Sequence, residues 1–209
     1  MSTQTINHGL GVTPEMIIAK ERDSGDGTGD WAVWHKDLAS GKYLTLNSTD
    51  GEDSWTDALF SNIDETSVDF GNDPDGSGIY LNGGDVPNNY IAYFFASVEG
   101  YSKVGSYEGT GSATAGPFIA LDFAPAYFLV KSTGGLTNWQ ILDNKRNTSN
   151  PANDFLRANS DIAETSNYDV DFLSNGLKIR TTDGDYNTSG TTYIYYAVAE
   201  SPLKTANAR

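Results

Sequence analysis

The 209-residue chain has no cysteine, only two histidines and few basic residues. Without cysteine it forms no disulfide, no thiolate nucleophile and no zinc–thiolate site, so its stability rests on packing alone. Its 13 lysines and arginines stand against 28 acidic residues, and the net charge of −15 repels phosphate backbones and anionic membranes. These absences predict a protein that does not bind nucleic acid.

Long apolar runs are missing as well. The longest, residues 118–130, is interrupted by Asp122 and is too short to span a bilayer. Residues 1–5 have no signal-peptide character. We therefore expect a soluble chain that is made in a cytoplasm and does not insert into a membrane.

The sequence contains one pattern of segments that occurs twice. The matched pairs are 14–20 with 125–131, Asp30-Trp31-Ala32-Val33 with Asn138-Trp139-Gln140-Ile141, 68–70 with 170–172, and 90–93 with 193–196. The spacing is 111 and 108 residues for the first two pairs and 102 and 103 for the last two. A period near 100 residues is too long for a solenoid, so it predicts two domain-sized units, residues 1–104 and 105–209, related by internal duplication. The single drop in spacing predicts one deletion, in residues 146–169 relative to 38–67.

Short apolar segments rich in β-branched and aromatic residues, separated by turn residues, predict an all-β fold. With 22 glycines spread along the chain, we expect two tandem antiparallel β-sandwich lobes of jelly-roll type. The predicted strands are 16–19, 90–96, 127–130, 177–181 and 193–199. The two weak helix candidates are 54–61 and 151–157.

The sequence offers little sign of catalysis. It has no nucleophile elbow, phosphate loop or dinucleotide fingerprint, and its histidines, His8 and His35, have no counterparts in the second copy. Paired carboxylates of the glycosidase type occur by chance in any acidic chain. We therefore expect a protein that is not an enzyme and has no cofactor.

Two Asp-Gly strings occupy corresponding positions and faintly resemble calcium loops. They contain Asp73 and Asp75 in the first copy and Asp183 and Asp185 in the second. Neither has the spacing or the terminal glutamate of an EF-hand. Hairpin turns are the favoured interpretation, because Asp tolerates and Gly supplies a positive φ, and calcium ligation is the alternative.

The tryptophans divide into two kinds. Trp31 and Trp139 occupy equivalent places, which predicts buried core anchors. Trp34 and Trp55 have no counterparts and are the candidates for an exposed, sugar-stacking contact. At the C-terminal end, Lys204 and Arg209 place positive charge in an acidic chain, and we expect this tail to make assembly contacts.

Several long strings resemble the duplicated domain of tail-fibre-like and other virion structural proteins of marine and cyanobacterial bacteriophages. They are His8–Pro14, Asp30–Val33, Gly100–Tyr107, Asn138–Arg146 and Tyr193–Pro202. The resemblance covers nearly the whole chain and implies a virion surface protein without assigned catalytic residues, either a capsid decoration or a tail-fibre, receptor-binding type.

From this resemblance we expect a virion location and contacts with other virion proteins. The usual symmetry of virion parts implies a homo-oligomer, with a trimer favoured. Two alternatives remain: a glycan-binding module that contacts the host surface, and a polysaccharide depolymerase. The sequence has no right-handed β-helix repeat that would favour the depolymerase.

Overall fold

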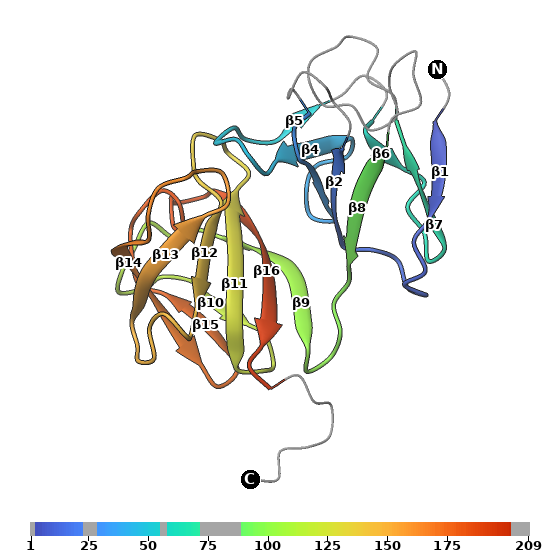
Figure 1. Cartoon of the computed structure of the whole chain (residues 1–209). Helices are drawn as coiled ribbons and strands as arrows, with labels where there is room; N and C mark the ends of the chain where they lie inside the picture. The colour runs from blue at the N-terminus through green and yellow to red at the C-terminus, as the bar shows by residue number, and fades with distance from the viewer. Residues whose placement is uncertain (1–2, 23–28, 55–57, 72–88, 202–209) are drawn as a thin grey trace. The chain divides into compact units, whose positions relative to one another are not determined.

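The computed structural model describes residues 3–22, 29–54, 58–71 and 89–201. The chain divides into two compact units, residues 1–96 (unit 1) and 97–209 (unit 2). Figure 1 shows that both are built from strands and connecting loops. The pairings are antiparallel and the described ranges contain no helix, so none there could cross a membrane. The all-β prediction is confirmed.

Within the residues that the structure describes, unit 1 contains two sheets. The larger has the order β5-β4-β3-β2-β8, formed by β2 (Met16–Glu21), β3 (Ala32–His35), β4 (Lys42–Thr45), β5 (Asp53–Ser54) and β8 (Tyr90–Phe95). The smaller has the order β1-β7-β6, formed by β1 (Gln4–Asn7), β6 (Phe60–Ser61) and β7 (Ser67–Phe70). Side chains from both sheets meet in one core, as expected of strands that bury one face: Ile17, Ala19, Ala32, Tyr43, Leu59, Phe60, Val68 and Phe70.

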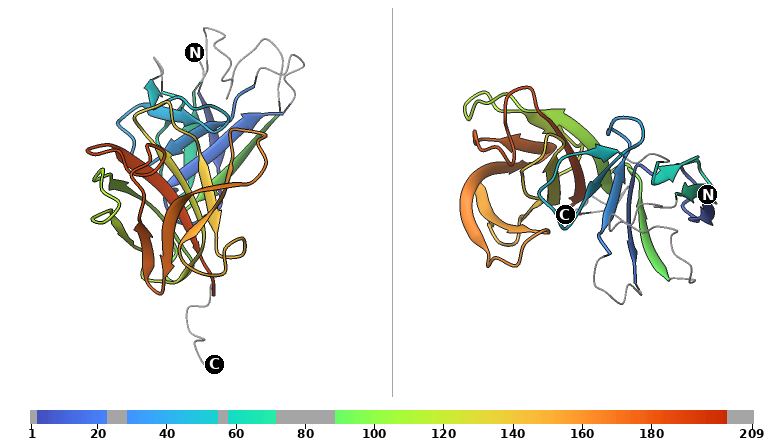
Figure 2. Two further views of the ribbon diagram at one scale, coloured as in Figure 1. Left: turned by 90° about the vertical axis from the view of Figure 1, so that its left-hand side faces the viewer. Right: turned by 90° about the horizontal axis from the view of Figure 1, so that it is seen from above.

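Unit 2 contains one eight-stranded sheet of order β10-β15-β14-β13-β12-β11-β16-β9. Its strands are β9 (Ser102–Glu108), β10 (Phe118–Ala120), β11 (Pro125–Ser132), β12 (Gln140–Asp143), β13 (Ala152–Arg157), β14 (Thr165–Leu173), β15 (Gly176–Ile179) and β16 (Thr192–Ala199). Figure 2 shows the sheet curling around a common interior. Its two edge strands approach each other, because Lys103 Nζ on β9 donates a hydrogen bond to Ala120 O on β10 at 2.9 Å. The sheet is therefore a nearly closed barrel.

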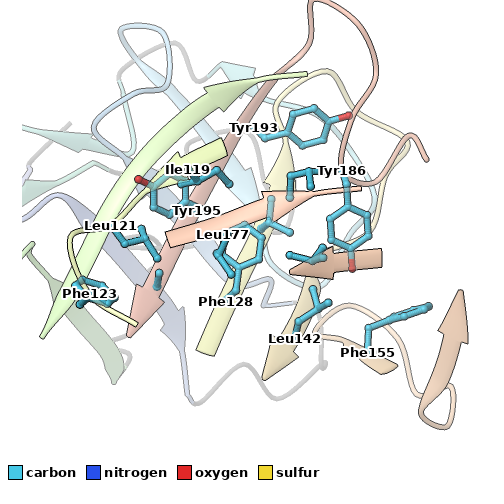
Figure 3. Close-up of a cluster of buried hydrophobic side chains, with 14 of the residues drawn as sticks. Ile119, Leu121, Phe123, Phe128, Leu142, Phe155, Leu177, Tyr186, Tyr193 and Tyr195 are labelled. Carbon is cyan, nitrogen blue, oxygen red and sulfur yellow. The ribbon is translucent and has the colours of Figure 1, made fainter. Parts of the chain in front are cut away.

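The core of unit 2 is rich in tyrosine (Figure 3). Two of the rings have partners for their polar ends, as buried rings usually do, whereas the buried Tyr186 hydroxyl makes no hydrogen bond with a described residue. Tyr193 donates from its hydroxyl to Gly184 O at 2.7 Å, and Tyr107 donates to Tyr186 O at 2.9 Å. Close packing against Tyr195 requires a glycine at position 105, since a Cβ there would lie 2.6 Å from the Tyr195 hydroxyl.

The two units share a strand order. The series β4-β3-β2-β8 in unit 1 matches β13-β12-β11-β16 in unit 2, and β1-β7-β6 matches β10-β15-β14. Matching by order pairs β7 with β15, so the expected match of residues 68–70 with 170–172, which lie on β14, is not supported. Under this matching, the β7–β8 connection, residues 71–89, is longer than the β15–β16 connection, residues 180–191. This differs from the predicted deletion in residues 146–169.

A small hydrogen-bonded corner precedes β3 in unit 1. The backbone N–H of Trp31 donates to Asn47 Oδ1 at 2.9 Å, and Asn47 Nδ2 donates to Asp30 Oδ1 at 2.6 Å. The Trp31 ring is only half-buried, with Lys20 Nζ 5.7 Å from its centroid and the Tyr93 ring stacked at 6.4 Å. The prediction that Trp31 is buried is therefore wrong.

The same corner precedes β12 in unit 2. The backbone N–H of Trp139 donates to Asn159 Oδ1 at 2.9 Å, and Asn159 Nδ2 donates to Asn138 Oδ1 at 3.0 Å. Here the tryptophan is 1% exposed, which confirms the prediction for Trp139. The two corners share hydrogen bonds but differ in what covers the ring.

Two further expectations need correction. The predicted boundary at 104/105 falls inside β9, whose seven paired positions along β16 hold it within unit 2. Residues 151–157, a helix candidate, contain β13 instead, which pairs with β12 and β14. Tertiary pairing outweighed a weak local preference there.

Candidate functional site

The two tryptophans predicted to make an exposed contact have different outcomes. Trp34 lies on β3, opposite Ile17 of β2, and its half-buried ring packs against the unit 1 core. It is therefore not a freely presented platform for a sugar. Trp55 lies outside the described residues, as do Lys204 and Arg209 of the tail.

The predicted aspartates of unit 2 hold a loop together. Asp183 Oδ1 accepts a hydrogen bond from the N–H of Asp185 at 2.8 Å. The carboxylate of Asp185, 7% exposed, accepts from the Asn138 N–H at 2.8 Å, from Asn138 Nδ2 at 3.1 Å and from Gln140 Nε2. Arg157 Nη2 lies 3.9 Å from Asp185 Oδ2. Both carboxylates are thus engaged by the protein itself.

The same loop is tied to the segment after β9 by Asn187, which is fully buried. Its Oδ1 accepts from the N–H of Thr110 at 2.6 Å, and its Nδ2 donates to Ser112 O at 3.0 Å and to Thr181 O at 2.7 Å. Its amide therefore joins the β15–β16 connection to residues 110–112.

Over the ranges that the structure describes, no group of three His, Cys, Asp or Glu side chains gathers in a way that could hold a metal ion. Asp73 and Asp75, the calcium candidates of unit 1, lie outside these ranges. The histidine on β3 fixes a turn: His35 Nδ1 accepts from the N–H of Asp37 at 3.1 Å. Asp143 has the same role at the end of β12, where its Oδ1 accepts from the N–H of Lys145 at 2.9 Å.

A depression lies at the end of the unit 2 barrel where β16 stops, and we call it the end depression. It has a volume of about 420 Å³. Its walls are the β12–β13 loop (residues 144–150), the end of β14 with the first residue after it (172–174), the start of β11 at Ala124-Pro125, and Glu200. Antiparallel strands bring these segments to one end because β11 and β13 begin where β12, β14 and β16 finish.

Two asparagines hold the wall of the end depression in place. Asn150 pairs with the backbone of Phe172 in both directions: its Nδ2 donates to Phe172 O at 2.9 Å, and its Oδ1 accepts from the Phe172 N–H at 2.8 Å. Asn147 Oδ1 accepts from the N–H groups of Asn153 and Asp154 at 2.9 and 2.7 Å. These bonds join the β12–β13 loop to β13 and to the end of β14.

Sequence reasoning did not find this site. Its residues come from four segments whose proximity depends on strand order. A local signal was present: residues 144–150, Asn-Lys-Arg-Asn-Thr-Ser-Asn, contain only polar side chains. Such a run between two strands is also the ordinary composition of a loop, so it did not distinguish a site from a connection.

The comparison with protein families matches residues 1–202 to the family described as "Domain of unknown function (DUF7483)". No curated protein and no solved structure matches the chain.

Proposed function

Since the chain belongs to the DUF7483 family across nearly its whole length, we propose a function for the full two-unit protein: it is a non-enzymatic structural protein of the bacteriophage virion surface, of the capsid-decoration or tail-fibre, receptor-binding type. The proposal starts from the resemblance carried by the strings from His8–Pro14 to Tyr193–Pro202. The structural observation that carries it is the use of buried polar side chains. The side chains of Asp185 and Asn187 form hydrogen bonds that fix the geometry of the loop, which suits a rigid surface module.

Virion composition tests the proposal directly. Particles purified by density gradient from cells that produce the phage are analysed by mass spectrometry and labelled with antibody for electron microscopy. We expect the protein in intact particles at a fixed ratio to the capsid or the tail. Abundant protein in the lysate with none in the particles would contradict the proposal.

A symmetric homo-oligomer, with a trimer favoured, is part of the proposal. Virion surface parts follow closed symmetry, and several copies of a weakly binding module gain avidity on a host surface. The chain mass is 22.5 kDa, so light scattering coupled to size exclusion distinguishes a trimer from a monomer. A single monomeric species at high protein concentration would contradict this part.

We also infer that the two units arose by internal duplication. The shared strand order and the shared Trp–Asn corner, Trp31 with Asn47 and Trp139 with Asn159, support this inference. An experimental structure tests it through the backbone path: the strands β4-β3-β2-β8 should superpose on β13-β12-β11-β16 with both corners aligned. A different chain direction in any of these strands would contradict it.

Glycan binding is the second candidate function, and it is compatible with a role at the virion surface. It is favoured by the end depression of unit 2, where amide, hydroxyl and apolar groups lie together.

A further inference from the structure

Unit 1 lacks, among its described residues, the strand that closes the barrel of unit 2. In unit 2, β9 lies beside β16 and is hydrogen-bonded to β10. The strand order matches β16 with β8 and β10 with β1, and no described strand lies between β8 and β1. A depression of about 310 Å³, which we call the strand slot, lies between these two strands. Its lining includes Gln4 and Ile6 of β1, Phe70 of β7, and Ala92 and Phe94 of β8.

The edge of β8 that faces away from β2 can pair with a further strand. The N–H of Arg22 donates to Asn89 O at 2.7 Å, which fixes the direction of the backbone groups at one end of β8. These directions alternate along an antiparallel ladder, so the N–H and C=O groups of Ala92 and Phe94 point away from β2. No described strand pairs with β8 on that side. Such an edge is a template for an added strand.

Ala92 occupies the place that Tyr195 has in unit 2. Ala19 pairs with Ala92, and Val130, at the matched position 111 residues later, pairs with Tyr195. Tyr195 lies opposite Gly105 of β9, where a Cβ would lie 2.6 Å from the tyrosine hydroxyl. The smaller side chain of Ala92 leaves room in unit 1. A strand that enters the slot can therefore carry a side chain larger than glycine at this place.

The strand that closes unit 2 comes from the segment that follows unit 1. β9 comes directly after β8 in the chain, yet it pairs with β16. In the proposed duplication β16 is the counterpart of β8, so residues 202–209, which follow β16 and lie outside the described ranges, are the counterpart of β9. The string Lys103-Val104-Gly105-Ser106-Tyr107 then aligns with Lys204-Thr205-Ala206-Asn207-Ala208. Since β9 already pairs with β16 in unit 2, the slot that remains for this segment is that of unit 1.

Charge and length favour the same match. Residues 1–96 carry 16 acidic and 4 basic side chains, whereas residues 202–209 contain Lys204 and Arg209 and no acidic residue. Opposite charges steer two such surfaces together. β8 has six residues, and a segment of eight residues is long enough to cover it at the same rise per residue.

We propose that residues 202–209 of one copy enter the strand slot of unit 1 in a second copy, antiparallel to β8 and with Ala206 opposite Ala92. The backbone groups of Ala92 and Phe94 then gain partners, as in other cases of β-strand addition. Because unit 2 donates and unit 1 accepts, the contact is head-to-tail, and its repetition around a symmetry axis closes a ring, of which a trimer is one. This inference rests on the proposed homo-oligomer and is independent of a virion location.

The first experiment compares the full chain with a chain that lacks residues 202–209. Light scattering coupled to size exclusion should show an oligomer of the full chain at a concentration at which the shortened chain is a monomer. Circular dichroism confirms that the shortened chain, which retains every described strand, is folded. A monomeric full chain would overturn both this inference and the proposed homo-oligomer. An oligomer of the shortened chain would overturn strand addition alone.

The second experiment locates the contact by cross-linking, since the chain has no cysteine of its own. With Ala206 opposite Ala92, Thr205 lies opposite Tyr93 in a non-hydrogen-bonded pair, whose Cα atoms are about 4.5 Å apart, within the range of a disulfide. Tyr93 is 45% exposed, so its replacement leaves the core intact. Oxidation of the Tyr93→Cys/Thr205→Cys chain should give interchain disulfides, seen as dimers and larger species on a non-reducing gel.

The matched control for the cross-link is Leu136→Cys/Thr205→Cys, which places the first cysteine at an 88% exposed position of unit 2. This chain should remain largely monomeric on the same gel. A disulfide within one chain, equal cross-linking in the control, or no cross-link in the Tyr93→Cys/Thr205→Cys chain would each overturn the proposal.

Discussion

Unit 1 and unit 2 arrange matching strands in one order but finish their sheets differently. In unit 2, β16 lies between β11 and β9, and most of its side chains are buried. In unit 1, β8 pairs with β2, and within the described residues it has no second neighbour. None of its six side chains is buried, and Tyr93 is 45% exposed. Burial of the β8 and β16 side chains thus follows whether the strand has a second neighbour in its sheet, as β16 has in β9, rather than its own apolar content.

The two tryptophans repeat this lesson. Both have the same backbone hydrogen bond, yet Trp139 is enclosed while Trp31 is half-open. Identical local bonding therefore accompanies unequal contributions to stability, and substitutions made in matched pairs measure the difference.

The largest expected difference comes from removing the tryptophans. Trp139→Ala should lower the free energy of unfolding by about 3–5 kcal/mol, because it opens a large cavity. Trp31→Ala should cost about 1–2 kcal/mol, because half of the ring already meets solvent. Denaturant unfolding followed by circular dichroism measures both. Equal losses would show that the two rings are equally enclosed.

The next largest effect concerns the loop that completes unit 2. Asn187→Ala should cost about 2–3 kcal/mol, because it removes a fully buried amide and leaves backbone groups of Thr110, Ser112 and Thr181 without this partner. Hydrogen exchange should accelerate at Thr110 and Gly111. The half-buried Asn153, whose backbone N–H donates to Asn147 Oδ1, serves as the control through Asn153→Ala, with a change under about 0.5 kcal/mol.

The paired corners allow a finer comparison. Asn159→Ala, in the partly buried corner of unit 2, should cost about 1–2 kcal/mol, and Asn47→Ala, exposed in unit 1, about 0.5–1 kcal/mol. Each variant leaves the backbone N–H of one tryptophan without its side-chain acceptor. Solvent can replace that acceptor more readily in unit 1. Thermal melts of the two variants provide the measurement, and a larger shift for Asn47→Ala would reverse the comparison.

Alkaline pH should act on unit 2. Burial raises the pKa of Tyr107 and of Tyr186 well above its usual value, and burial raises the pKa of Tyr127 to about 12. Above the unfolded value of about 10 the unfolded chain loses these protons first, so stability is complete below that pH and falls as pH rises further. Absorbance at 295 nm should show that fewer than the 12 tyrosines of the chain ionise before the protein unfolds. Ionisation of all 12 before unfolding would contradict the burial of these rings.

Acid should act on unit 1, with the smallest effect. Backbone N–H groups of Thr66 and Ser67 donate to Asp64 and lower the pKa of its carboxyl to about 2. Its stabilisation is present above the unfolded value of 3.8 and is lost as pH falls through about 2. A ¹³C titration of the Asp64 carboxyl should give this pKa, and Thr66→Ala should raise it. A value near 3.8 in the unmodified chain would show that the turn is not formed.

Periodicity and composition predicted much of the fold. The segments expected at 16–19, 90–96, 127–130, 177–181 and 193–199 are β2, β8, β11, β15 and β16, because their β-branched and aromatic content matches a pleated, packed surface. What composition could not supply was pairing. Residues 68–70 and 170–172 have similar sequences, but they lie on strands with different places in their sheets. In the strand order, β7 lies between β1 and β6, whereas β14 lies between β15 and β13.

The candidate site was predicted least well. Trp34 was chosen because it lacks a counterpart, yet it packs on the core, since an aromatic ring on a short strand is covered by whichever sheet faces it. The end depression depends on four separate segments meeting, and only the sheet order brings Asn144, Phe172 and Glu200 together. No local pattern contains that information.

The pairing of β9 with β16 has a consequence for the modularity of unit 2. Ser102 lies opposite Val198, and the N–H of Ala199 donates to Tyr101 O at 2.8 Å, so the chain enters and leaves this barrel at neighbouring points. A unit with adjoining ends can be inserted into a surface loop of another protein while the two ends of that loop stay close together. A short linker between the ends of the unit permits circular permutation. Closing so short a gap involves little loop entropy. Unit 2 is therefore suited to transfer between larger proteins as an independent domain.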